Sequence, residues 1–230
     1  MFKPLTLAAA LLIGTPAFAV STVSVRFVSR DASAPVLNTS MTSNYITGGL
    51  NFTDAATGSF LAYCVEPSQS FALSFKSDGV TPNFKTYTVD SFSASQASLL
   101  QGLYSSSFAS VHSGNQQAAF QLAVWEIMRE SSGTLSIAEG NGNFFLKTAG
   151  ATGQQNGINN SVQALASHYL SAAESYNGPG LYSLTKLSNA TYQDLVVASA
   201  VNAVPEPETY ALFLAGLGAI GLMARRRLPR

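Results

Sequence analysis

Charged side chains are scarce in this chain of 230 residues, since Asp, Glu, Lys and Arg make up 10% of it, with 12 acidic and 12 basic side chains. Recognition of nucleic acid or of an anionic membrane surface needs a basic patch, so this balance argues against both partners. Only two histidines are present, His112 and His168, and neither has a Cys, His or carboxylate at metal-ligand spacing. No phosphate loop or nucleotide fingerprint occurs. We therefore expect no metal, no cofactor, no nucleic-acid partner and no enzyme activity.

Aromatic residues are plentiful, by contrast. Low charge can accompany disorder, but 14 Phe and 9 Tyr supply enough apolar surface for a core. Apolar residues alternate along 22–28, 59–65, 70–75, 84–89 and 192–201, which predicts strands. Helical patterns cover 95–104, with Ser93 or Ser95 as the cap, then 115–129 and 162–173, whereas 140–160 is rich in Gly, Asn and Gln and predicts a surface loop. The fold class we expect is α+β, an antiparallel β-sheet or sandwich with a few packed helices, as a single domain over residues 20–203.

The N-terminus has the features of a secretory signal peptide. Lys3 precedes an apolar stretch over residues 5–13, and Ala17-Phe18-Ala19 is a small-x-small cleavage pattern. Residues 1–19 would then be removed and the mature chain would start near Val20. A retained N-terminal membrane anchor is the alternative, although the apolar run is short for a span.

The C-terminus, residues 204–230, has three parts in order. Val204-Pro205-Glu206-Pro207 comes first, an apolar segment over 209–224 follows, and Arg225, Arg226 and Arg227 end it. The prolines favour an extended, accessible strip. The apolar segment reaches most of the way across a bilayer core, and the arginines would stay on the cytoplasmic side. A buried C-terminal helix of the domain is the alternative, but such a helix would show a polar face.

This tail resembles the PEP-CTERM sorting signal of Gram-negative bacteria. In that family an exosortase-type membrane protease recognises the Pro-Glu-Pro motif and removes the hydrophobic tail. The resemblance implies export, a transient membrane tether, processing near Pro205-Glu206-Pro207, and a final place at the cell surface or in the matrix of an exopolysaccharide-producing, biofilm-forming host. It implies nothing about the activity of the domain before the tail.

A single cysteine, Cys64, is the main chemical feature of that domain. A lone Cys in an exported chain cannot form an internal disulfide, so its thiol is buried, reactive or intermolecular. Strand alternation places Phe60, Ala62 and Cys64 on one face and apolar residues on the other, so the thiol is expected in a dry place. This setting fits an inert core cysteine, and it also fits a thiol placed to react inward.

A glutamine, Gln121, lies inside the apolar arc of the predicted helix 115–129. It shares a helix face with Ala118, Leu122 and Trp125. A buried amide without partners would cost about 1–3 kcal/mol. The side chain of Gln121 therefore either has hydrogen-bond partners or is not a free amide.

Tyr63-Cys64 on a strand and Gln121-Leu-Ala-Val-Trp125 on a helix together resemble the thioester domains of bacterial surface adhesins. In that family the Cys thiol attacks the Gln carboxamide and expels ammonia, which leaves an internal thioester that an amine on a target can open. The resemblance implies that Cys64 supplies the sulfur and Gln121 the acyl carbon. It further implies that Tyr63 and Trp125 exclude water around the bond.

Other interpretations stay open. The domain could be a non-covalent structural or binding component of a biofilm matrix, with a structural Cys64 and a hydrogen-bonded Gln121. A Cys64–His112 hydrolase is a third class. Glu66 and Glu126 follow the two motif positions closely, and they would either polarise the thioester or simply occupy surface and turn positions.

Overall fold

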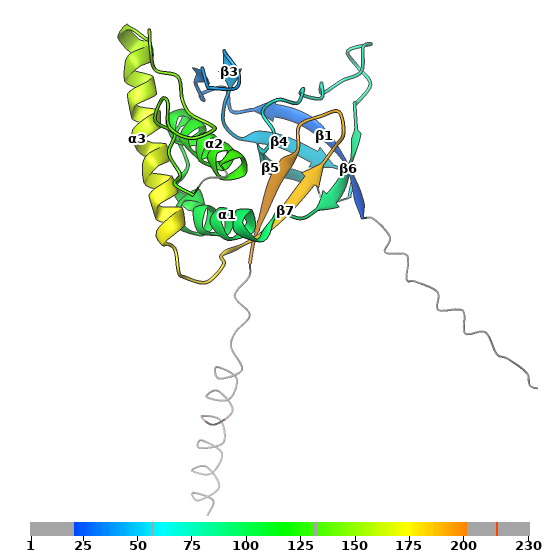
Figure 1. The fold of residues 1–230 in the computed structure, drawn as a ribbon. Helices are drawn as coiled ribbons and strands as arrows, with labels where there is room; N and C mark the ends of the chain where they lie inside the picture. Colours follow the sequence, from blue (N-terminus) through cyan, green and yellow to red (C-terminus); the bar gives the residue numbers. More distant parts are fainter. Residues whose placement is uncertain (1–20, 57, 131–132, 202–214, 216–230) are drawn as a thin grey trace, which may run out of the picture.

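Six antiparallel strands close into a barrel, and three helices cover one side of it (Figure 1). The computed structural model describes residues 21–56, 58–130, 133–201 and 215. The elements are β1 (Thr22–Arg30), β2 (Val36–Leu37), β3 (Tyr45–Ile46), β4 (Leu50–Asp54), β5 (Gly58–Cys64), β6 (Lys85–Asp90), α1 (Ala94–Ser107), the 3-10 helix η1 (Phe108–Ser110), α2 (Gly114–Arg129), α3 (Gly153–Ser175), β7 (Tyr182–Ser188) and β8 (Leu195–Ala200). The order around the barrel is β1-β4-β5-β8-β7-β6, and β2 pairs only with β3. The α+β class predicted from the sequence is confirmed.

Alternation along the strands fills the barrel with aromatic and aliphatic side chains. Phe52 lies opposite Phe27 on β1 and opposite Phe60 on β5, and its ring stacks on Phe60 with centroids 5.8 Å apart. Because side chains two residues apart share a face, Ala62 and Cys64 continue the inner row of Phe60. Cys64 pairs with the fully buried Leu195 of β8. The thiol therefore belongs to the inner face of the barrel, at the end where β5 finishes.

The helices cover the outer face of the barrel on the side of β5 and β7. Figure 1 shows α1 and α2 between α3 and the strands. Both begin with a capping box, in which the Ser93 or Ser113 side chain and the third helical residue exchange hydrogen bonds with the backbone. Every residue of α2 from Ala118 to Ile127 is buried, because α3 and the barrel enclose this helix. The position of Gln121 inside an apolar helix follows from that enclosure.

A register shift interrupts β1. Phe27 pairs with Phe52, but Ser29 pairs with Asn51 and Arg30 with Leu50, so Val28 is the extra residue of a β-bulge. Without the bulge, Ser29 would share the inner face of Phe27 and Arg30 would point outward. The bulge therefore turns Arg30 to the inner side of the barrel end.

Two sequence predictions were wrong in detail. Residues 70–75 form no strand, and only Ser70 and Phe75 make isolated bridges. The reason is that β5 already has β4 and β8 on its two sides, which leaves no free ladder position beside it. The predicted loop 140–160 ends early, because α3 begins at Gly153. Its first turns are largely exposed and so lack the apolar periodicity by which helices are recognised.

The two predicted targeting segments fall on parts of the chain that the structure does not describe. They are the signal peptide over 1–19, with Ala17 and Ala19, and the tail over 204–230, apart from residue 215. Within the described residues, no helix combines the length and hydropathy that a membrane span requires.

Candidate functional site

The structure brings Cys64 and Gln121 together. The backbone N–H of Cys64 donates to Gln121 Oε1 at 3.1 Å, and Gln121 Nε2 donates to the Cys64 carbonyl oxygen at 2.7 Å. Cys64 and Gln121 are each 1% exposed. The carboxamide thus has two buried partners, both on the backbone of the residue whose thiol the sequence analysis singled out.

This contact exists because β4 begins only at Leu50 and so does not reach Cys64 at the end of β5. The last β4–β5 pair is Leu50 with Ala62, whereas on the other side β8 still pairs with Cys64 through Leu195. The Val65 N–H donates to Asp194 on that β8 side. The backbone N–H and C=O of Cys64 therefore point to the side on which β5 no longer pairs with β4. Gln121 of α2 occupies that side instead. Since one Cys64 group is a donor and the other an acceptor, the orientation of the amide is fixed.

The sulfur lies in an apolar setting with two polar neighbours. Tyr45 Oη donates to Cys64 Sγ at 3.9 Å, and Gln193 Nε2 donates to the same Tyr45 oxygen. Burial raises the pKa of the Cys64 thiol to about 12, although the Glu66 backbone and the side chains of Trp125 and Tyr45 lower it. Burial also raises the pKa of Tyr45 far above its usual range. Both groups therefore stay protonated at neutral pH, and Tyr45 remains a hydrogen-bond donor.

Tyr45 and Trp125 form the aromatic cover of the sulfur. Their rings meet edge to face, with centroids 4.8 Å apart, and Trp125 is fully buried. Trp125 is one of the two residues that the sequence analysis named as packing around the bond, and that role stays a prediction. Tyr45 was not predicted, because it lies on the two-residue strand β3, which has too few residues to show a pattern.

Tyr63 lies on the other face of β5. Its ring packs on Phe120 at 4.8 Å between centroids, and its hydroxyl donates to Gln117 Oε1. The same Gln117 oxygen accepts from the Gly49 N–H at 3.2 Å. Tyr63 thus ties β5 to α2 one helical turn before Gln121 and helps to fix the position of the carboxamide.

The two glutamates near the motif residues have separate surroundings. Glu66 forms an ion pair with Arg129 at the end of α2, at 2.9 Å between Oε1 and Nη2. Glu126 is fully buried, and its Oε1 accepts from the Ser136 N–H at 2.7 Å. Burial, and to a smaller extent the charge of Glu130, raises the pKa of Glu126 to about 7, against the lowering effect of Ser136. Both glutamates act as anchors of α2, one at the barrel and one at the loop before α3.

The histidines take no part in this site. His112 and His168 are exposed, and neither is among the groups that bond to the buried thiol or shift its pKa. Within the described ranges no three His, Cys, Asp or Glu side chains gather in a way that could hold a metal ion.

Comparison with solved structures finds similar chains, among them three bacterial proteins. The N-terminal domain of the Streptococcus pyogenes pilus tip adhesin Cpa is 15% identical, with a TM-score of 0.44, over 82% of this chain and 97% of that one. The N-terminal thioester domain of the fibronectin-binding protein SfbI from Streptococcus pyogenes is 12% identical, with a TM-score of 0.43, over 84% and 100%. The Bacillus anthracis TIE protein is 16% identical, with a TM-score of 0.40, over 81% and 34%. The first two of these neighbours are thioester-domain adhesins, and all three share low identity with this chain.

Comparison by sequence gives a result for the tail only. No curated protein matches the chain. A family model described as the PEP-CTERM protein-sorting motif matches residues 203–227, which include Val204 to Pro207 and the three arginines. The chain therefore carries a PEP-CTERM sorting motif, which marks an exported protein that the membrane protease exosortase processes.

Proposed function

We propose that this chain is an exported surface protein whose domain forms a thioester between Cys64 and Gln121 and uses it to bind covalently to an amine. The observation that supports this most is the carboxamide of Gln121 lying on the backbone of the only cysteine, inside a dry barrel end. Nucleophilic attack within the folded chain needs this proximity before any other feature.

Bond formation is balanced without an external reagent. Cys64 Sγ attacks the Gln121 carboxamide carbon, the C–N bond breaks, and the nitrogen leaves as ammonia with the thiol proton. Negative charge develops on Gln121 Oε1 in the tetrahedral intermediate. The Cys64 N–H already donates to that oxygen and stabilises the charge. The leaving nitrogen is held by the Cys64 carbonyl.

An amine opens the thioester by a second acyl transfer, in which the sulfur of Cys64 is the leaving group. An amine attacks the acyl carbon, the C–S bond breaks, and the products are an amide at Gln121 and a free Cys64 thiol. Because burial disfavours the thiolate, the leaving sulfur takes up the proton that the attacking amine loses. Tyr45, protonated and directed at the sulfur by Gln193, is placed to donate a hydrogen bond to the leaving sulfur. The same burial keeps water away and slows hydrolysis.

Localisation follows from the two ends of the chain. The signal peptide over 1–19 directs export, the apolar segment 209–224 tethers the precursor to the membrane, and an exosortase-type protease cleaves near Pro205-Glu206-Pro207. The mature domain then acts at the cell surface or in a biofilm matrix as a covalent adhesin, not as an enzyme.

Intact-mass measurement of the purified domain tests the proposal. The bonded domain should weigh one ammonia less than its sequence, should gain methylamine on incubation, and should then show one free thiol. Cys64→Ser and Gln121→Ala are the matched controls, and both should show the full sequence mass and no adduct. A wild-type mass equal to the sequence, with a titratable thiol in the native state, would leave Gln121 as a structural link between α2 and β5 and the domain as a non-covalent component.

A further inference from the structure

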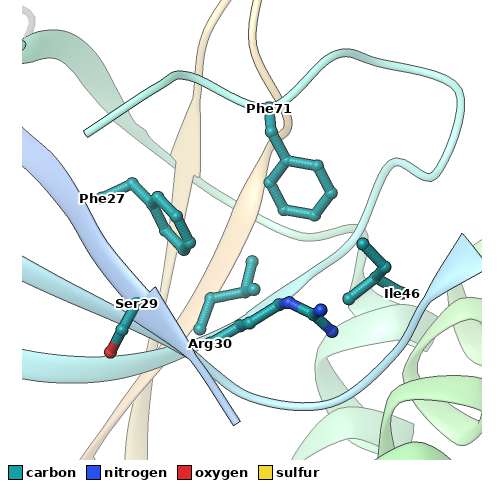
Figure 2. Close-up of a pocket in the computed structure, with 6 residues that line it drawn as sticks. Phe27, Ser29, Arg30, Ile46 and Phe71 are labelled. Carbon is teal, nitrogen blue, oxygen red and sulfur yellow. The ribbon is translucent and has the colours of Figure 1, made fainter. Parts of the chain in front are cut away.

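A pocket of about 420 Å³ opens at the end of the barrel (Figure 2). Its lining is Phe27, Ser29, Arg30, Ile46, Leu50 and Phe71. Four of these side chains are aromatic or aliphatic, one is a small hydroxyl, and one is a cation. The volume falls in the usual range for small-ligand sites, which are mostly apolar with a few placed polar groups.

The pocket lies at the same barrel end as the thiol. Arg30 pairs with Leu50, and Leu50 pairs with Ala62, so one row crosses β1, β4 and β5. Cys64 follows Ala62 on the same face, about 7 Å farther along the strand. Tyr45 separates the two sites, because its ring lies 6.2 Å from Phe71 of the pocket and its hydroxyl contacts Cys64 Sγ.

Tyr45 is also the solvent-accessible residue between the pocket and the thiol. It is half-buried, whereas Cys64, Gln121 and Trp125 are buried. It belongs to β3, which pairs only with β2 and is not part of the barrel. A ligand in the pocket therefore meets Tyr45 as the last side chain before the sulfur.

Arg30 gives the pocket a charge preference. Figure 2 shows its guanidinium extended toward Ile46, below the ring of Phe71. Arg30 forms no ion pair with any residue in the described part of the chain, and the bulge at Val28 is what turns it inward. A bulge that re-aims one side chain is typical of functional sites. An unpaired cation among apolar side chains favours a ligand with an anionic group.

We propose that this pocket selects the amine that opens the thioester, and that its ligand is a primary amine on an apolar arm that also carries an anionic group. The inference rests on the proposed thioester. The arm fills the space between Phe27, Leu50 and Phe71, the anion pairs with Arg30, and the amine reaches the acyl carbon past Tyr45. A lysine side chain next to an acidic residue of a target protein has this chemistry.

The test measures amine incorporation by intact mass, after ammonia loss has been verified for each variant. The probes are methylamine, hexylamine, ω-aminohexanoate and hexanediamine. They differ in the length of the apolar arm and in the charge at the end away from the reacting amine. In the wild type, ω-aminohexanoate should react faster than hexanediamine. Arg30→Glu should reverse this order, with each rate shifting about fivefold for an exposed ion pair of about 1 kcal/mol. Lys147→Glu makes the same charge change at an exposed position outside the pocket and should keep the wild-type order.

A second variant tests the apolar wall. Phe71→Ala should slow hexylamine and leave methylamine, which has no arm, unchanged. If ammonia is lost but the order of the probes is the same in wild type, Arg30→Glu and Phe71→Ala, the pocket has no role and the thioester stands. If no variant and no wild-type sample loses ammonia, the proposed function and this inference fall together.

Discussion

Opening the Cys64–Gln121 bond with methylamine should make the domain markedly less stable. The two residues are 57 positions apart in the chain. In the chain-entropy account developed for disulfides, a cross-link that closes a loop of this length stabilises the folded state by about 4 kcal/mol. For a domain of this size, 1 kcal/mol corresponds to roughly 2–4 °C, so the midpoint of thermal unfolding should fall by about 8–16 °C.

Differential scanning calorimetry on the bonded domain and on its methylamine adduct measures this shift, with the bond state of each sample verified by mass. Cys64→Ser treated with methylamine is the control, because it has no bond to open and should melt at the same temperature before and after. An adduct that is complete by mass and melts within a degree or so of the bonded form would refute the reasoning, since closing the loop would then have restricted nothing.

Three further predictions concern the fold and the tail. The folded-state pKa of Glu126, about 7, lies above the ordinary value of 4.5, so stability should fall as pH rises between these values, and Glu126→Gln should flatten that fall in urea titrations. Gly102→Ala places a Cβ in steric overlap with the backbone oxygen of Ala173 in α3 and should destabilise by about 1–3 kcal/mol in denaturant titrations, whereas Gly157→Ala, which meets nothing within 4 Å in α3, should stabilise by about 0.5–1 kcal/mol. Glu206→Ala should leave uncleaved precursor in the membrane fraction on immunoblots, and unchanged release would contradict recognition of the Pro-Glu-Pro motif.

The sequence predicts the parts of the fold that repeat a period for long enough. The helix 115–129 was placed within a residue of α2, because its apolar side chains recur over four turns. β4 was missed, since only two of its five residues, Leu50 and Phe52, are buried. β7 was missed because Lys186 and Ser188 break its alternation. Neither strand could be predicted from its own residues, because its place in the fold depends on pairing with neighbouring strands.

The candidate site likewise contains residues that the sequence identifies and residues that it does not. Cys64 and Gln121 stand out in the sequence because one is the only cysteine and the other is an amide among apolar residues. Tyr45, Gln193 and Arg30 do not stand out. Their positions depend on pairing between distant segments and on a bulge that shifts β1 by one residue, and no local pattern encodes either.

Closure of the six strands has a consequence for a protein with so few charges. An open sheet exposes unpaired N–H and C=O groups at its first and last strands, and proteins commonly guard these edges with lysines and other charges against strand addition by a second chain. A chain with 10% charged residues has few charged side chains available to protect strand edges. Because β6 returns to pair with β1, the six-stranded barrel exposes no strand edge to which a second chain could add, and its closure does what edge charges do in an open sheet.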